Sequence, residues 1–332
     1  LLEIPFRKQI GEINTGDSVK TGQAVSVDND VVSVSPVSGT ISNISNWPGD
    51  YGRKYTAVSV DVDESEAVDE KFSEMAAELS LDRAVQYLSS VPGKPPLEIF
   101  SDPNYEIKTI VITGMDQDIL VTTNQYILQA ETDALKAGIN VLRKITGIDS
   151  VILAAPPELV SKAHTTDAIV KTVENTYPSA NPRAIMKDII GEVVPEGKNP
   201  EDLGYCFMTA EAAASLGNAV ENRRIPVNKV LTVIKKDGNT AMVSARIGTP
   251  ISEIFKACDI TVKEKDRVVF GGPLTGSAVY SENHPVLPDT DAIMVQDNED
   301  IPLVSDYPCI NCGECVRICP ARMPVSMLVR FL

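Results

Sequence analysis

The sequence contains few of the residues on which common enzyme chemistries depend. Its 332 residues include two histidines, one tryptophan and six cysteines. The histidines, His164 and His284, stand alone in the sequence, so neither is a candidate metal ligand or catalytic residue. No P-loop, GxSxG nucleophile elbow or HExxH helix occurs, which excludes the protein classes that those motifs define.

Long apolar runs and an excess of positive charge are absent as well. No apolar stretch approaches the roughly 20 residues that a bilayer span needs, and no secretory signal precedes the first strands. The 30 basic residues are outnumbered by 46 acidic ones, for a net charge of −16. This charge argues against nucleic acid and anionic lipid as direct partners but leaves basic proteins open. The length and the 43% hydrophobic content predict two or three domains with ordinary cores.

Four of the six cysteines are present in one short segment near the C-terminus. Cys309, Cys312, Cys315 and Cys319 form a C-x2-C-x2-C-x3-C pattern followed by Pro320. This is the spacing of bacterial-ferredoxin iron–sulfur ligands. Zinc sites normally use two separated pairs of ligands, and a disulfide framework does not crowd its cysteines in this way. We therefore expect these thiolates to hold a [4Fe-4S] cluster in a reducing compartment.

A single copy of the motif leaves two roles open for Cys319. In two-cluster ferredoxins the fourth cysteine of the motif ligates the other cluster. Cys319 therefore either completes one cluster with the other three cysteines, or serves a second cluster whose remaining ligands follow Leu332. Because the sequence starts without Met and ends thirteen residues after Cys319, we expect it to be a fragment of a longer polypeptide.

Residues 1–62 contain two turn-rich, β-branched segments, 16–25 and 31–41, that each predict a strand, a turn and a strand. The pattern resembles the lipoyl-type barrel-sandwich hybrid. In a carrier domain a modified lysine would lie at the hairpin tip, but here the tip is Asp28-Asn29-Asp30 and Lys20 belongs to an earlier turn. We predict an unmodified domain, followed in residues 63–104 by an acidic, solvated linker and a helix over 80–88.

Residues 105–226 alternate between predicted strands and helices. Strands are expected at 108–113 and 150–155, and helices at 125–145, from 158 onward and at 209–219. This rhythm predicts a Rossmann-like domain with a parallel sheet. Residues 227–300 are β-rich, with a hairpin over 230–245, a helix that has Thr249 as N-cap and Pro250 at its first position, and a strand at 268–270. Residues 301–332 carry the cysteine motif.

The order of these parts resembles the C subunit of the Rnf electron-transport complex and, more distantly, the Nqr A subunit. The matching stretches are Ser35-Pro36-Val37-Ser38-Gly39-Thr40, Ile247-Gly248-Thr249-Pro250, Gly271-Gly272-Pro273-Leu274-Thr275-Gly276 and the cysteines. The resemblance implies a multidomain α/β protein that combines a barrel-sandwich hybrid, a Rossmann-like domain, a β-grasp domain of the soluble-ligand-binding (SLBB) type and a ferredoxin-type segment. It also implies two clusters in the full-length protein and other subunits of a redox complex as partners. Such a protein would have no transmembrane segment and would be cytoplasmic, or peripheral on the cytoplasmic face of a membrane.

One departure from that family concerns its flavin. Family members bind FMN and NADH through a glycine-rich G-G-A-G-F-P-type loop before the α/β domain. The corresponding residues 88–100 have Gly93 as their one glycine, between prolines, and prolines obstruct the close backbone N–H groups that a phosphate needs. The family's acidic segment is replaced by Gly114-Met115-Asp116-Gln117-Asp118. We infer that the flavin and NADH site is degenerate, and FMN is not expected.

Three hypotheses follow. The first is an iron–sulfur electron-transfer subunit that relays single electrons through Cys309, Cys312, Cys315 and Cys319. The second is an FMN-containing NADH dehydrogenase subunit, and the third is a non-redox docking subunit. Among the other residues, Cys206 and Cys258 are predicted to be buried apolar side chains, and Asp116 and Asp118 are predicted to be exposed loop acids.

Overall fold

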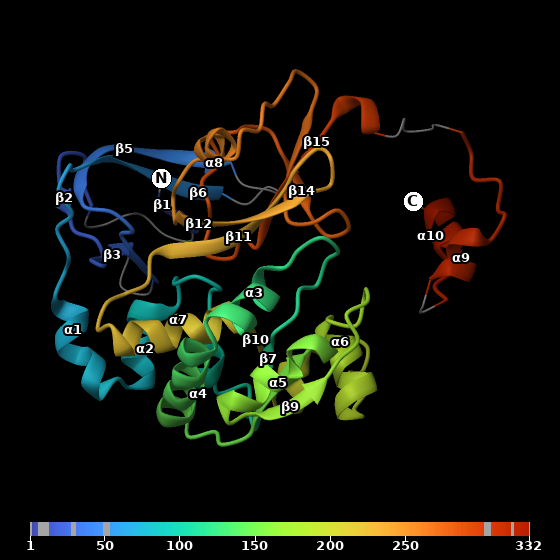
Figure 1. Ribbon diagram of the computed structural model, residues 1–332, viewed down its shortest axis with the longest axis horizontal. Helices are drawn as coiled ribbons and strands as arrows, with labels where there is room; N and C mark the ends of the chain where they lie inside the picture. Colours follow the sequence, from blue (N-terminus) through green and yellow to red (C-terminus); the bar gives the residue numbers. More distant parts are fainter. Residues whose placement is uncertain are drawn as a thin grey trace. The chain divides into compact units, whose positions relative to one another are not determined.

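The structure is a computed structural model that describes residues 2–5, 13–27, 31–48, 54–301, 307–319 and 322–331. The chain forms two compact units, Leu1–Asp297 and Asn298–Leu332; the second is drawn in red in Figure 1. Among the described residues, no helix has both the length and the apolar character of a membrane span.

The N-terminal part is an antiparallel sheet with an added hairpin. The sheet order is β1-β6-β5-β2, with β1 at Leu2–Pro5, β2 at Ser18–Val19, β5 at Gly39–Pro48 and β6 at Lys54–Val62. The hairpin pairs β3, Ala24–Val27, with β4, Val31–Val34. Buried apolar residues, among them Val19, Ile41 and Val58, form the small core of this N-terminal part. The tip at 28–30 lies outside the described residues, and Lys20 is exposed.

The acidic segment after this sheet has mostly exposed side chains, as predicted, and its backbone also pairs with the N-terminal part. The N–H of Thr21 donates to the carbonyl of Ala67 at 2.9 Å, and the N–H of Asp69 donates to the carbonyl of Thr21 at 2.9 Å. The short helices α1, Lys71–Met75, and α2, Leu81–Leu88, follow, together with the 3-10 helices η2, Ala76–Glu78, and η3, Leu97–Ser101. Ser80 caps α2 as its side chain accepts from the N–H of Arg83 at 3.4 Å. The predicted solvated linker is thus tied to the N-terminal sheet by backbone hydrogen bonds.

A four-stranded parallel sheet confirms the predicted mixed α/β fold. Its order is β10-β7-β8-β9, with β7 at Thr109–Thr113, β8 at Val151–Ala155, β9 at Ile169–Thr172 and β10 at Tyr205–Thr209. All neighbouring strands are parallel. The strand order reverses between β7 and β10, and in open α/β sheets the crevice at such a reversal is where ligands bind.

The helix predicted at 125–145 is two helices. These are α3, Thr123–Ala130, and α4, Thr132–Thr146, separated by Glu131, whose φ of −120° and ψ of 35° are not helical. The hydroxyl of Thr132 donates back to the carbonyl of Leu128 at 2.8 Å and stabilises the break. The remaining helical segments of this layer are η4 Pro157–Leu159, α5 Val160–Ala163, η5 His164–Thr166, α6 Pro182–Ile185, the π-helical η6 Met186–Ile190, η7 Pro200–Leu203 and α7 Ala210–Glu221.

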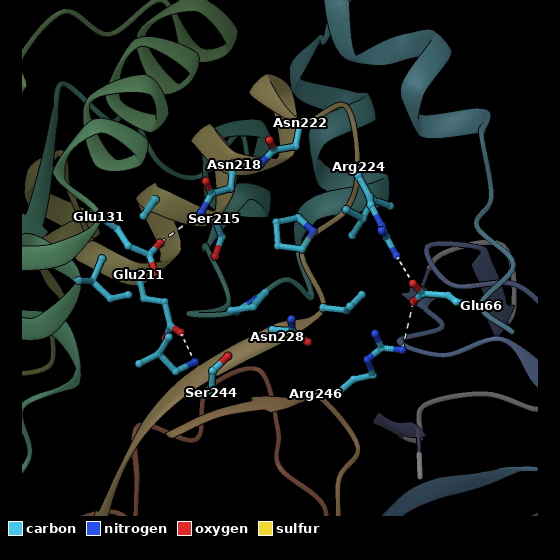
Figure 2. A pocket seen from close by; sticks show the side chains of 17 residues that line it. Glu66, Glu131, Glu211, Ser215, Asn218, Asn222, Arg224, Asn228, Ser244 and Arg246 are labelled. Atoms are coloured by element: carbon cyan, nitrogen blue, oxygen red, sulfur yellow. Dashed lines mark hydrogen bonds and ion pairs between the residues drawn. The ribbon is translucent and has the colours of Figure 1, made fainter. Parts of the chain in front are cut away.

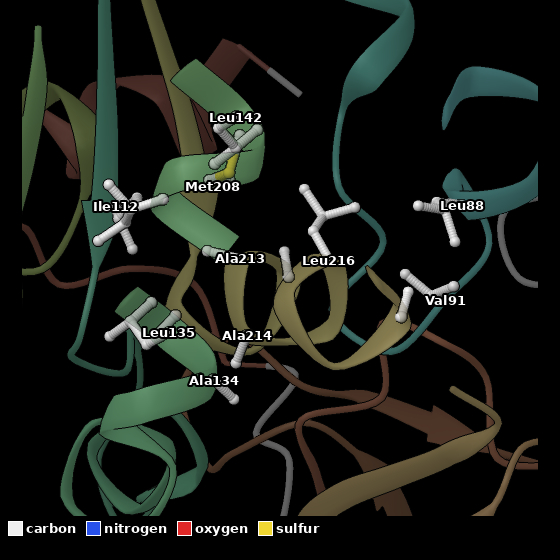
Figure 3. Packing of buried hydrophobic residues seen from close by; sticks show 14 of the residues in the cluster. Leu88, Val91, Ile112, Ala134, Leu135, Leu142, Met208, Ala213, Ala214 and Leu216 are labelled. Carbon is white, nitrogen blue, oxygen red and sulfur yellow. The ribbon is translucent and has the colours of Figure 1, made fainter. Parts of the chain in front are cut away.

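Helices α4 and α7 cross with their backbones in contact. A Cβ on Gly138 of α4 would lie 1.7 Å from the carbonyl oxygen of Ala213, and one on Gly217 of α7 would lie 2.1 Å from that of Ala134. Figure 3 shows the packing around this crossing, where Leu135 and Leu142 belong to α4 and Leu216 to α7. The main core therefore depends on small residues at this point.

A five-stranded mixed sheet follows, with the order β12-β11-β15-β13-β14. The strands are β11 Asn228–Ile234, β12 Thr240–Arg246, β13 Arg267–Phe270, β14 Ser277–Val279 and β15 Ala292–Gln296. Strands β11 and β15 are parallel, and the other pairs are antiparallel. Helix α8, Ile251–Ala257, buries Ile251, Ile254 and Phe255 against this sheet. Its N-cap is Pro250 and not Thr249, so the predicted start was wrong by one residue.

In its described residues, the second unit contains two short helices, α9, Glu314–Ile318, and α10, Val325–Phe331, after the 3-10 helix η8, Asn298–Asp300. Gly313 precedes α9 in a left-handed conformation with φ +78°. Cys309 and Cys312 lie on the loop before α9, Cys315 lies on α9, and Cys319 is the extended residue that follows it.

Candidate functional site

The four motif cysteines form no disulfide in the part of the chain that the structure describes. Cys309 and Cys312 are exposed, and Cys315 and Cys319 are half-buried. The N–H of Asn311 donates to the sulfur of Cys309 at 3.4 Å. Within the described part of the chain no three His, Cys, Asp or Glu side chains lie close enough together to hold a metal ion. The structure therefore places these cysteines on one short segment without gathering their sulfurs, and Pro320 lies outside the described residues.

The chemistry of this donor set nevertheless fits an iron–sulfur cluster. Asn311 and Gly313 have φ values of +58° and +78°, so the chain turns twice between the first three cysteines. Thiolates at this spacing are the ligands that such clusters use, and backbone N–H groups close to the sulfurs are among the factors that set cluster potentials.

A cavity of about 320 Å³ lies where the strand order of the parallel sheet reverses. Thr113 and Thr209, at the ends of β7 and β10, contribute to one wall, and Gly271 and Gly272 contribute to the wall from the five-stranded sheet. Four carboxylates line it, from Asp116, Asp118, Asp289 and Asp291, and none of the described lining residues is basic. The lining thus offers a phosphate no cationic side chain, although Lys94 pairs with Asp289 at 3.2 Å and Lys229 with Asp291 at 2.9 Å.

Asp116 and Asp118 are not exposed loop acids, so that prediction was wrong. Both are half-buried. The Oδ1 of Asp116 accepts from the N–H of Asn124 at 2.9 Å, and its Oδ2 accepts from the N–H of Gln125 at 3.3 Å, which caps α3. Burial raises the pKa of Asp116 against the effect of these hydrogen bonds. Asp118 accepts from the N–H and the hydroxyl of Thr275, both at 2.7 Å, and so fixes the turn after β13.

The backbone N–H groups in the first turn of α7 also donate to side chains of this chain. The N–H of Glu211 donates to the Oδ1 of Asn124 at 3.3 Å, and the N–H of Ala212 donates to the hydroxyl of Thr209 at 3.1 Å. Gly93, with φ +80°, packs against this turn, because a Cβ there would lie 2.3 Å from the nitrogen of Ala212. The lone glycine of loop 88–100 thus serves backbone packing, and helix N–H groups that could bind a phosphate are used internally.

A buried ion cluster joins α7 to the five-stranded sheet. Lys229 of β11 has a side chain that is 0% exposed; it binds the carboxylate of Glu211 and donates to Asp291 at 2.9 Å. The second oxygen of Glu211 accepts from the N–H of Val230 at 2.9 Å. Burial raises the pKa of Glu211 to about 7, although Lys229 acts to lower it. Burial acts to lower the pKa of Lys229, but the two carboxylates outweigh it and raise that pKa.

Sequence reasoning missed this cluster. The signals were a lysine beside an apolar strand and a glutamate in an alanine-rich helix, and either residue alone is typical of a solvated surface.

The other cysteines and the two histidines lie outside these sites. Cys206 is fully buried, as predicted, and burial raises the pKa of its thiol to about 12. Cys258 is half-buried against the core of the five-stranded sheet. His164 is exposed. His284 is buried, with ring centroids 5.4 Å from Trp47 and 4.8 Å from Tyr280.

Comparison with known proteins gives the following matches. Residues 93–193 match the family described as NqrA second alpha/beta domain. The chain is 22% identical to the C subunit of the Na(+)-translocating ferredoxin:NAD(+) oxidoreductase complex of Acetobacterium woodii, covering 96% of this chain and 78% of that protein. It is also 22% identical to the C subunit of the proton-translocating ferredoxin:NAD(+) oxidoreductase complex of Clostridium ljungdahlii, covering 98% and 77%.

A solved NAD+-reducing [NiFe]-hydrogenase chain in the H2-reduced state has the same fold over 69% of this chain, with a TM-score of 0.52 and 14% identity. The match spans about half of that chain, 49%.

The chain therefore belongs to the class of mixed α/β proteins with a parallel sheet, and it shares this fold with that hydrogenase chain. More particularly, the chain is a homologue of the C subunits of Rnf-type ion-translocating oxidoreductase complexes, which confirms the resemblance found in the sequence.

Proposed function

We propose that the chain is an iron–sulfur electron-transfer subunit of a larger redox complex. It would relay single electrons through a [4Fe-4S] cluster held by Cys309, Cys312, Cys315 and Cys319, with a second cluster in the full-length protein. The observation that carries this proposal is the ferredoxin-type cysteine spacing in a homologue of subunits named for ferredoxin:NAD(+) oxidoreduction. The cluster, when bound, would supply one-electron redox chemistry.

The rest of the chain is proposed as a scaffold of four further parts. They are a barrel-sandwich hybrid at 1–62, a linker and helix at 63–104, a Rossmann-like domain at 105–226 and an SLBB β-grasp domain at 227–300; the ferredoxin-type segment follows at 301–332. The N-terminal sheet with its hairpin, the parallel sheet, and the mixed sheet covered by α8 support these assignments.

We infer further that this scaffold has lost the flavin and NADH site. Support comes from the four carboxylates of the 320 Å³ cavity and from the side chains that cap α3 and α7. The alternative, an FMN-containing NADH dehydrogenase subunit, is favoured by one observation: a cavity does lie at the strand reversal, where flavins bind in related folds.

As partners we propose the other subunits of the complex, with the chain peripheral on the cytoplasmic face of a membrane. The net charge of −16 supports basic protein surfaces, and not nucleic acid, as its contacts.

Iron, sulfide and flavin analysis of protein purified without air tests these proposals. We expect about four iron and four sulfide ions per cluster, an EPR signal after reduction, and no FMN in a denatured extract. Cys312→Ser should lose the signal of its cluster, while Cys258→Ser, at a cysteine outside the motif, should keep it. Iron-free or zinc-containing protein would rule out the electron-transfer proposal, and stoichiometric FMN would establish the alternative. Loss of the signal in Cys312→Ser with electron transfer unchanged would favour a docking role.

A further inference from the structure

A second cavity, of about 600 Å³, lies between helix α7 and the hairpin β11–β12. Figure 2 shows the side chains that ring it. Glu211, Ser215, Asn218 and Asn222 of α7 fall at i, i+4, i+7 and i+11, so one face of the helix lines the cavity. On the hairpin, Asn228 faces Arg246 and Val230 faces Ser244 across the strands.

The polar walls distinguish this cavity from a packing gap. A helix layer normally meets a sheet through apolar side chains. Here amide, hydroxyl and charged groups face each other across the space instead. Glu211 already has its partners in Lys229 and the N–H of Val230, so the groups that can meet a polar ligand are the exposed ones, among them Asn222, Arg224 and Asn228.

The charges in the cavity are separated. On one side Glu66 binds Arg224 at 2.7 Å and Arg246 at 3.1 Å, and the hydrogen bond from Arg224 lowers the pKa of Glu66. Each of the two guanidinium groups uses one nitrogen on Glu66, of the five N–H donors that a guanidinium has. Figure 2 places Glu131 and Glu211 on the other side. Two arginines face one carboxylate, Glu66, so the arginine side of the cavity has an excess of positive charge. On the other side Lys229 offsets Glu211, which leaves Glu131 as the excess negative charge. The charges of the lining and of Lys229 together are close to neutral.

We propose that this cavity binds a small zwitterion with a carboxylate and an ammonium group, of the amino acid or dipeptide class. The carboxylate would lie towards Arg224 and Arg246, the ammonium towards Glu131, and the amides of Asn218 and Asn222 would take the peptide or side-chain polar groups. The volume falls within the range of about 300–1,000 Å³ that is usual for ligand pockets. A nucleotide is disfavoured, since its phosphates would add negative charge beside Glu66, Glu131 and Glu211.

This inference goes beyond the proposed electron-transfer function and does not depend on the cluster. Its test uses the full chain, wild type and Cys312→Ser, and calorimetry with the dipeptide alanyl-glutamine and with free glutamine. We expect saturable binding of at least one of these zwitterions to both proteins. Acetylating the amine or amidating the carboxylate of the bound zwitterion should each weaken binding at least about tenfold, and ADP should bind more weakly still.

Two variants assign the site. Glu131→Gln should weaken the zwitterion but not its acetylated form, and Arg246→Gln should weaken the zwitterion but not its amidated form. Lys256→Gln, at an exposed ion pair with Glu253, is the matched control and should change nothing. The inference is overturned if neither zwitterion binds more tightly than about 10 mM, if the blocked forms bind equally well, or if ADP binds best. The blocked ligands give this answer on wild-type protein, even if a variant does not fold.

Discussion

Lys229 is the residue on which the junction between α7 and β11 depends. Its ammonium is fully buried and shared by Glu211 and Asp291. A buried ion cluster is weak evidence of net stability, because desolvation offsets much of the attraction. Removing one member is a different matter, since the partners are then left buried without a counter-charge.

We therefore expect Lys229→Met to lower the free energy of unfolding by about 3–5 kcal/mol. Chemical denaturation at neutral pH measures the effect. Lys256→Met is the control, because that side chain is 72% exposed and its ion pair should contribute less than about 1 kcal/mol. Equal stability of the two variants would contradict the importance assigned to the buried cluster.

Glu211 should make stability depend on pH. Its pKa is about 7 in the folded chain against an ordinary value of 4.5, so the folded state holds more protons between these values. The resulting stabilisation is complete below about pH 4.5 and is lost as pH rises through about 7, an effect on the order of 3 kcal/mol. Asp116, whose pKa is also raised, adds in the same direction.

Glu211→Gln should flatten this dependence, which urea denaturation from pH 5 to pH 8 would measure. The exposed Glu196→Gln should leave the slope of the wild type unchanged. A Glu211→Gln variant with the wild-type slope would show that another group is responsible.

At the residue scale the sequence predicted what depends on local spacing or on the character of one side chain. The buried Cys206 is of this kind, whereas the cluster at the four motif cysteines stays a prediction. The roles of Asp116, Asp118 and Lys229 were not predicted, because their partners lie on other elements: Asn124 on α3 for Asp116, Thr275 after β13 for Asp118, and Glu211 on α7 for Lys229.

At the scale of elements, the break between α3 and α4 shows where a periodic pattern is insufficient. Ile127, Leu128, Leu135 and Leu142 keep a helical apolar spacing across Glu131, because both helices bury residues in the same core. The break brings the carboxylate of Glu131 to Asn218 of α7 at 3.3 Å. A contact of that kind has no local signature, whereas the end of α4 has one in Gly147, its left-handed C-cap residue with φ +72°.

The α4–α7 crossing gives a sharp test of packing. Gly138→Ala would place a methyl group 1.7 Å from the carbonyl oxygen of Ala213, so the helices must separate. We expect a loss of about 3 kcal/mol, at the upper end for overpacked cores. Asn140→Ala, at an exposed position of the same helix, should stay within about 0.5 kcal/mol of wild type.

Thermal denaturation followed by circular dichroism would measure both variants. If Gly138→Ala melted with the wild type, the two helices could not be as close as described.

At the scale of the whole molecule, the division at Asp297 and Asn298 predicts that the cluster segment and the scaffold unfold separately. Trp47, the only tryptophan, lies in the first unit, so its fluorescence reports on that unit alone. We expect Cys312→Ser to leave the urea midpoint of this fluorescence unchanged while the iron content falls. A lowered midpoint would mean that the two units stabilise each other.

The succession of a β region, an α/β region with a parallel sheet and a second β region could be predicted, because each has its own periodicity in the sequence. The 600 Å³ cavity could not. Its walls come from the acidic segment, from α7 and from β12, and only the folded chain brings Glu66, Asn218 and Arg246 around one space.

The double ion pair of Glu66 also bears on how the protein can be divided experimentally. A shortened polypeptide that starts at Lys71 would keep Arg224 and Arg246 but lack the carboxylate that holds them. Two adjacent guanidinium groups would then repel each other beside an open hollow and attract stray anions from the buffer. Dissection of this molecule should therefore retain the acidic stretch, or exchange both arginines for neutral residues at the same time.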